Sequence, residues 1–387
     1  MMRPVSFFIA IFASSILVAM SAPADAPINP GIQIEGRDED SCGYVNLSRQ
    51  TGDVKNQNPV GNCYAFTAVE LMNFGTEKKE RVSAIATSIQ YGDWIQKQGN
   101  QSKTSSGLDG GWTADAINAA NSEGACREKD VESYDDSDSK ALTEIKKMFE
   151  SSMDRDECPA NESKEFKTIN KSSKEIFRGL TKSYFFRPGK TKREFAQRNW
   201  EIFNDVMNDS KIASKDRFNE YMRSLVKEAC KKTTRGLPHW AKGTPEDVKA
   251  SQRPKTFYQD AFNYINDGLD QGKPTGVGYY PHYEDSGFIT KAAAIGFVNH
   301  ASLVAGRKYV SSRNKEKQGC YLLVKNSWGE EWPGERLKGL DAQPATDNYG
   351  VPIPGYFQVK DTVFSKYIKS FTNLGNDPKV PLTLKTN

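Results

Sequence analysis

The segment Gln57-Asn58-Pro59-Val60-Gly61-Asn62-Cys63-Tyr64-Ala65-Phe66 leads from a turn-rich stretch into a run with helical spacing. Residues 63–74 are expected to form a helix with Phe66, Val69 and Met72 on one face. Cys63 would then start the helix, where unpaired amides and the helix dipole stabilise a thiolate. A buried or disulfide-bonded cysteine is the alternative, and this segment alone does not exclude it.

Two distant segments supply candidate partners for this thiol. His300 lies in the apolar run 296–304, and Asn326 opens Asn326-Ser327-Trp328-Gly329 after the apolar run 321–324. The other histidines, His239 and His282, are interpreted as ordinary surface residues. Because the few histidines and scattered cysteines lack metal-ligand spacing, we expect no metal and no cofactor.

These blocks, in the order Cys, His, Asn, resemble the active-site segments of papain-like cysteine peptidases. The resemblance implies that Cys63 is the nucleophile, His300 the general base and acid, and Asn326 the residue that orients the imidazole. It also implies that Gln57, six positions before the cysteine, donates to the oxyanion with the Cys63 amide. Trp328 would cover the His–Asn hydrogen bond and line the substrate site.

Gly110 and Gly111 resemble the paired glycines whose bare backbone binds the extended substrate in this family. Paired glycines alone indicate only a turn. The family's usual disulfide beside this segment is absent, because Val60 and Leu108 stand at its two positions. We expect a Val60–Leu108 contact to replace that bridge.

The spacing of the blocks predicts an insertion. Cys63 and His300 are 300 − 63 = 237 residues apart, whereas roughly 130–150 residues separate the pair in the papain and cathepsin group. The charged region 135–250, with amphipathic helical patterns, accounts for the difference. We expect it to form a helical subdomain at the cleft edge, which could restrict access, shape a specificity pocket or bind a protein inhibitor or partner.

Strand patterns begin after Pro274, so helices precede strands. This predicts an α+β protein, with the papain-like two-subdomain fold of a helical half and a β-barrel-like half. The expected division is 1–22 signal peptide, 23–41 flexible N-terminal arm, 42–134 helical half with the nucleophile, 135–250 inserted charged helical subdomain, 251–375 strand-rich half, and 376–387 C-terminal tail.

The N-terminus predicts export. Phe7 to Ala19 is a thirteen-residue apolar run after a positive start, shorter than a bilayer-spanning helix needs and typical of a signal peptide. We therefore expect a secreted or periplasmic protein with no stable membrane association. With Cys63 free, the other five cysteines allow at most two disulfides.

The formal charge of +4 gives no reason to expect a nucleic-acid partner. The resemblance to papain-like peptidases implies hydrolysis of protein or peptide substrates through a Cys63 thioester. Two alternatives stay open: a transpeptidase or exopeptidase with the same chemistry, and a non-catalytic binding module on the same scaffold.

Overall fold

The computed structural model describes residues 34–57, 60–76, 81–98, 107–131, 133, 146, 149, 192–213, 216–230, 242–243, 256–279, 300–330, 337 and 340–373. The expected signal peptide, most of the N-terminal arm, the C-terminal tail and the greater part of the 135–250 insert lie outside these residues. His239, His282, Asn58 and Asn299 lie outside them as well.

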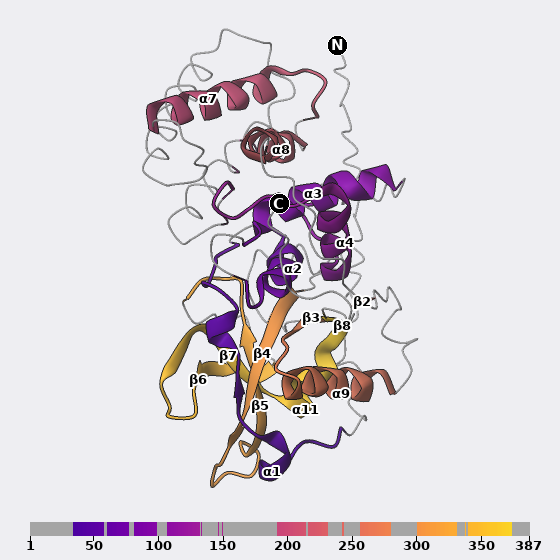
Figure 1. Ribbon diagram of the computed structural model, residues 1–387, viewed down its shortest axis with the longest axis vertical. Helices are drawn as coiled ribbons and strands as arrows, with labels where there is room; N and C mark the ends of the chain where they lie inside the picture. Colours follow the sequence, from indigo (N-terminus) through magenta and orange to yellow (C-terminus); the bar gives the residue numbers. More distant parts are fainter. Residues whose placement is uncertain are drawn as a thin grey trace, which may run out of the picture.

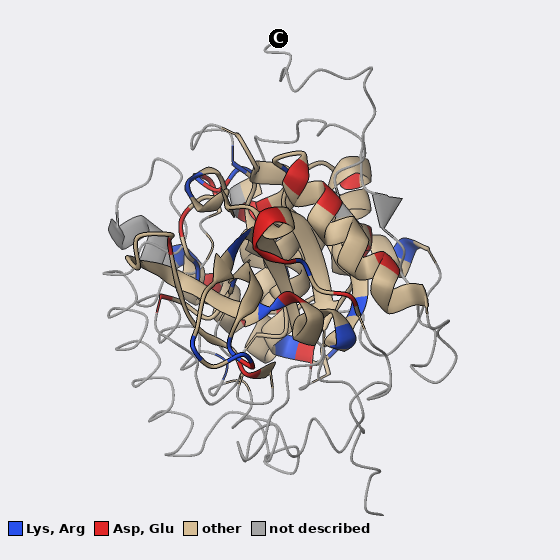
Figure 2. Ribbon diagram, turned by 90° about the horizontal axis from the view of Figure 1, so that it is seen from below, with Lys and Arg blue, Asp and Glu red and all other residues tan. Residues whose placement is uncertain are grey.

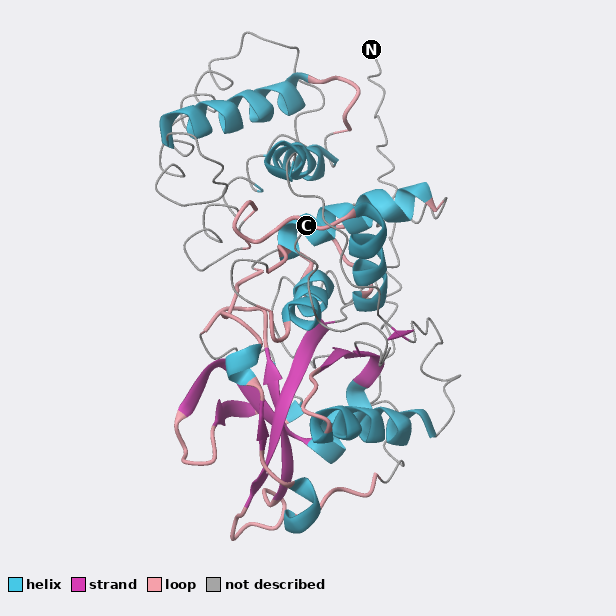
Figure 3. Ribbon diagram, viewed as in Figure 1, coloured by secondary structure: helices cyan, strands magenta, loops and turns pink. Residues whose placement is uncertain are grey.

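The described chain is an α+β protein with an antiparallel sheet, as the sequence predicts. The strand order is β2-β8-β3-β4-β5-β7-β6, and β1 pairs with β4. One end of the molecule is helical, and the strands gather at the other end together with a few helices (Figure 3). The strands are β1 (Val45–Asn46), β2 (Lys242–Gly243), β3 (Thr275–Tyr279), β4 (His300–Val310), β5 (Gly319–Lys325), β6 (Gln343–Thr346), β7 (Pro352–Lys360) and β8 (Ile368–Asn373).

Strand β4 organises the sheet, because it pairs with β3, β5 and β1. Its residues are buried from His300 to Lys308, as expected of a strand covered on both faces. A β-bulge follows Val304, and at this point β1 pairs with β4, with Asn46 opposite Gly306. A Cβ at Gly306 would lie 2.4 Å from the carbonyl oxygen of Val45, so only glycine permits this approach.

Helix α2 (Cys63–Asn73) lies between the sheet and the other helices (Figure 1). The prediction of a single apolar stripe is incomplete, because α2 is buried on nearly every side. Phe66 and Val69 belong to the core shared with helices, whereas Ala65, Ala68 and Leu71 belong to the core that includes the sheet. A helix packed on two sides needs apolar residues beyond one stripe.

The helical side contains α3 (Ala84–Lys97), α4 (Thr113–Glu123), α7 (Lys192–Asn208) and α8 (Arg217–Ala229). Helices α7 and α8 belong to the expected insert, yet they share one hydrophobic core with α2 and α3. A disulfide joins Cys126 to Cys230, and Arg223 on α8 forms an ion pair with Asp93 on α3 at 2.8 Å. This part of the insert is therefore integrated with the helical side.

Beside the sheet lies α9 (Thr256–Asp270), and the chain end contributes α11 (Asp361–Phe364) and the short helix η8 (Ser365–Tyr367). Residues 34–41 belong to the arm expected to be flexible, and of these Ile34 is buried whereas the others are partly or fully exposed. Ile34 is buried among aromatic residues of α9, and α1 (Glu39–Cys42) ends in a disulfide between Cys42 and Cys320. The short helix η1 (Ser48–Gln50) then leads toward α2.

Acidic and basic residues are interspersed over the described surface instead of gathering by sign (Figure 2). Among the described residues, no helix has both the length and the apolar composition needed to cross a membrane.

Candidate active site

Cys63 is the first residue of α2 and is 9% exposed. Asn62 is the N-cap residue, but its side chain makes no capping hydrogen bond. The amides of Cys63 and Tyr64, at the start of α2, contact the thiol, whereas the amides of Ala65 and Phe66 donate to the Asn62 carbonyl.

The protonation state of Cys63 differs from the sequence prediction. Burial raises the pKa of the Cys63 thiol, and hydrogen bonds from the backbone amides of Ala301, Tyr64 and Cys63 itself only partly offset this effect. Desolvation disfavours the thiolate. The helix N-terminus alone therefore does not produce a resting thiolate, and deprotonation requires a base nearby. The Ala301 contact puts the residue after His300 beside the sulfur.

His300 begins β4 and is 3% exposed. Its Nε2 lies 3.0 Å from Oδ1 of Asn326, which directly follows β5. The antiparallel pairing of β4 with β5 brings the two residues together, although 26 positions separate them in sequence.

A second contact fixes which imidazole nitrogen carries a proton. The backbone amide of Ser327 donates to the same Oδ1 of Asn326 at 2.8 Å. An atom that accepts from a backbone amide must be the carbonyl oxygen of the carboxamide, not its nitrogen. Nε2 of His300 is therefore the donor, and in the neutral ring Nδ1 is the basic nitrogen.

Two aromatic rings hold the imidazole in place. Trp328 stacks on His300 with ring centroids 3.9 Å apart and an interplanar angle of 19°. Tyr279, which pairs with His300 across β3 and β4, approaches with its ring nearly perpendicular at 5.6 Å. The tyrosine hydroxyl lies 3.1 Å from Ser302 Oγ. Stacked and perpendicular rings exclude water and restrict rotation of the imidazole.

Gln57 is 5% exposed and lies beside the segment that follows Asn326. Its backbone amide donates to the carbonyl of Ser327 at 2.7 Å. The Ser327 hydroxyl donates to Gln57 Oε1, and Gln57 Nε2 donates to the Val60 carbonyl at 3.0 Å. The amide orientation is thereby fixed, and Nε2 has a second hydrogen. Ser327 acts here as a partner that motif reading did not single out.

The paired glycines lie beside the loop of the nucleophile. A Cβ at Gly61 would come within 3.0 Å of the Asp109 backbone. Gly111 packs on the ring of Tyr64, whereas Gly110, with φ of +136°, faces open space. A side chain is absent at Gly110, and its backbone is therefore not covered by one.

Val60 and Leu108 are 2% and 1% exposed and belong to the same hydrophobic core. Their segments are adjacent at Gly61. Val60 and Leu108 are therefore part of an apolar cluster in the region where the related family has its disulfide.

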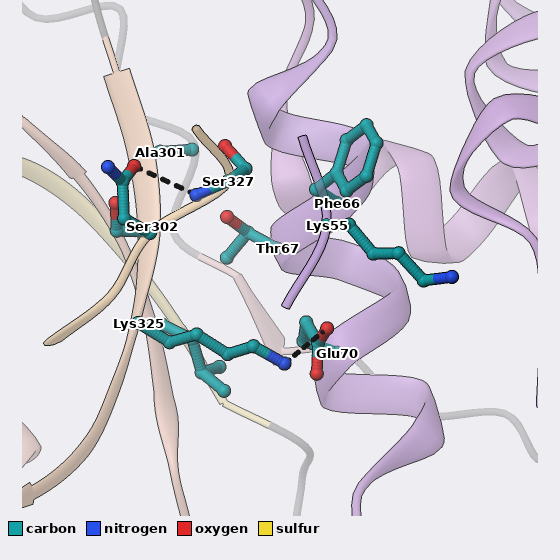
Figure 4. A pocket seen from close by; sticks show the side chains of 10 residues that line it. Lys55, Phe66, Thr67, Glu70, Ala301, Ser302, Lys325 and Ser327 are labelled. Carbon is teal, nitrogen blue, oxygen red and sulfur yellow. Dashed lines mark hydrogen bonds and ion pairs between the residues drawn. The ribbon is translucent and has the colours of Figure 1, made fainter. Parts of the chain in front are cut away.

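One further group adjoins the site, and sequence reasoning did not find it. Lys325, the last residue of β5, forms an ion pair with Glu70 of α2 at 2.7 Å (Figure 4). A cavity of about 10 Å³ between the strands and α2 is lined by this pair, Asn326, Thr67 and neighbouring residues, with room for about one water molecule. The sequence feature that could have revealed it is a lysine directly before Asn326 in an otherwise apolar strand, because a buried lysine needs a partner.

In the described part of the chain, His, Cys, Asp and Glu form no group of three or more that could hold a metal ion. The two disulfides, Cys42–Cys320 and Cys126–Cys230, leave Cys63 as the free thiol among the described residues. Cys158 lies outside them.

No family model matches this chain, and no curated protein matches it.

Proposed function

We propose that this chain is a papain-like cysteine peptidase that hydrolyses peptide bonds through a thioester on Cys63. The observation that carries the proposal is the His300 Nε2–Asn326 Oδ1 hydrogen bond of 3.0 Å. It lies under the Trp328 ring and next to the strand residue whose amide contacts the Cys63 sulfur. A nucleophile, a base and an orienting group in one place are the requirements for thiol acyl transfer.

His300 performs the proton transfers in this mechanism. Because burial raises the pKa of the Cys63 thiol, Nδ1 of His300 takes the Sγ proton as the sulfur attacks the scissile carbonyl. The imidazolium then donates that proton to the leaving amine, and a thioester remains. His300 next removes a proton from water, which attacks the thioester, and the returning proton restores the thiol and releases the carboxylic acid.

Gln57 and the Cys63 amide would bind the oxyanion. Since Ser327 and Val60 fix the Gln57 carboxamide, its second Nε2 hydrogen serves as a preorganised donor for developing negative charge. Such donors cost little reorganisation during the reaction, because neighbouring groups hold them before substrate binds.

The same proposal covers the finer fold and the substrate. The helical and sheet-containing cores on the two sides of α2 would be the halves of a papain-like fold. A peptide would pair with the open backbone at Gly110. Helix α8 adjoins this segment, where Asn219 reaches Asp109 at 3.5 Å, so the insert would limit which substrates enter. Two disulfides support export to an oxidising compartment.

An epoxide-type thiol inhibitor tests the proposal. It should label Cys63 and abolish peptide hydrolysis, and both effects should be absent in Cys63→Ala. A peptide library then gives the cleavage profile, and an added amine nucleophile separates hydrolysis from transpeptidation. Intact protein that binds peptides but neither cleaves them nor reacts at Cys63 would contradict the proposal and favour a binding module.

A further inference from the structure

The ammonium group of Lys325 is buried and fully occupied. Lys325 is 4% exposed, and its Nζ donates to the carbonyl oxygens of Thr51 and Gly52 at 3.0 Å and of Asp53 at 3.1 Å. It also contacts Oε1 of Glu70 at 2.7 Å. Since an ammonium has three hydrogens, these four oxygens leave no capacity for another ligand, and Lys325 is a structural junction.

The three segments joined at Lys325 each carry part of the candidate site. Lys325 itself precedes Asn326 at the end of β5. Glu70 lies 70 − 63 = 7 residues after Cys63 on α2, which is about two helical turns. Asp53 lies four residues before Gln57. In Figure 4 the lysine side chain extends from the strands to Glu70 on the helix.

We propose that Lys325 and Glu70 form a positioning clamp that sets the location of the Cys63 thiol relative to the His300–Asn326 pair. This inference rests on the proposed function and deepens it. Neither residue touches the reacting atoms, so both act through the groups they hold.

Apolar packing alone leaves this placement poorly determined. Ala65 and Ala68 of α2 are fully buried in the core that includes the sheet, and contacts between small apolar groups are not directional. The cavity of about 10 Å³ beside Thr67 shows that packing is incomplete between α2 and the strands. The directional contact between Lys325 and Glu70 therefore fixes the position of α2 relative to the strands, which apolar packing leaves undetermined.

The electrostatics of the pair do not favour a large contribution to stability. Burial raises the pKa of Glu70, even though Lys325 acts to lower it, so desolvation outweighs the attraction between the two charges. Buried ion pairs commonly contribute less stability than apolar residues of the same volume.

The test compares Lys325→Met and Glu70→Gln with Arg223→Met as a matched control. Arg223→Met removes the contact with Asp93 that joins α8 to α3 and the contact with Glu220 within α8, and neither contact holds a proposed catalytic group. For each folded protein we would measure kcat and KM on a peptide. The rate of Cys63 alkylation by chloroacetamide across pH would report the thiol's environment independently of peptide cleavage.

We expect Lys325→Met to lower kcat about 10- to 100-fold, as for small displacements of reacting groups, with KM changed less than about threefold. Its alkylation profile should shift along the pH axis. Glu70→Gln, which retains the three carbonyl contacts, should lower kcat about three- to tenfold. Arg223→Met should lower the melting temperature and leave kcat and the alkylation profile within about twofold of the parent.

A folded Lys325→Met protein with the parent kcat and alkylation profile would overturn the clamp. Where Lys325→Met does not fold, Glu70→Gln decides by the same criteria. A parent protein that cleaves no peptide would sink the proposed function, whereas the alkylation profiles would still distinguish a clamp from an ordinary structural ion pair.

Discussion

The two sides of α2 are packed in different ways. Toward the sheet it presents small or medium residues, and a Cβ on Gly276 of β3 would lie 3.0 Å from Thr67 and from Leu71. Toward the helices it presents Phe66 and Val69, which join a core with many aromatic residues. Close backbone approach on the sheet side brings α2 near β4 and β5, which carry His300 and lead to Asn326, while bulk on the other side supplies burial.

The difference predicts which substitutions affect the reaction and which affect only stability. Substitutions on the sheet side should change kcat in folded protein. Substitutions on the helical side should lower the free energy of unfolding, and the protein that remains folded should keep the parent kcat and KM.

The largest effect is expected from Gln57→Ala on the sheet side. Losing one oxyanion donor should lower kcat by about 10²–10³ with little change in KM, because the interaction develops only in the transition state. Steady-state kinetics on a peptide substrate checks this. A parent-like kcat would remove Gln57 from the mechanism.

The next effect is expected from Met222→Ala on the helical side. Met222 is fully buried in the core shared by α2, α3, α7 and α8, so truncation should lower the free energy of unfolding by about 2–5 kcal/mol. Urea unfolding measures the loss, and kcat per labelled Cys63 should stay at the parent value. A large fall in kcat of folded protein would show that the two sides are coupled.

The smallest effect concerns Asp361 at the start of α11, away from both sides of α2. Burial raises the pKa of Asp361 from 3.8 to about 6, although the Thr362 amide opposes this. The folded state therefore binds this proton more tightly than the unfolded state. Stability falls as pH rises through this window, by at most about 3 kcal/mol. In Asp361→Asn that fall should vanish from urea titrations between pH 4 and 8, and an unchanged slope would contradict the assignment.

Local patterns predicted several helices of the fold. The helical spacing after Cys63 corresponds to α2, and the amphipathic patterns expected within 135–250 correspond to α7 and α8. Helix α4 was missed because its buried face is mostly alanine, which gives no strong apolar stripe. Strand β6 was missed because it contains Pro344 and buries only Ala345, as an edge strand does.

The candidate site was predictable where each group has its own local motif. Cys63, His300 and Asn326 each lie in a distinctive segment, so their order along the chain was informative. Lys325 is marked only by its place beside Asn326 in an apolar strand, and Glu70 has no local motif. Their pairing gives no signal, because 325 − 70 = 255 residues separate them. The raised pKa of Cys63 was unpredictable for a related reason, since it depends on burial by distant elements.

The position of α2 against β4 and β5 also bears on protein synthesis. The thiol is made early, but Asn326 follows it by 326 − 63 = 263 residues. An interrupted or truncated chain that ends before β5 would contain Cys63 without the lysine and asparagine that complete its surroundings. Under the proposed function, a nascent chain would therefore stay inert until β5 and Asn326 had left the ribosome and folded against α2. Chain order itself would then protect the cell that makes the protein.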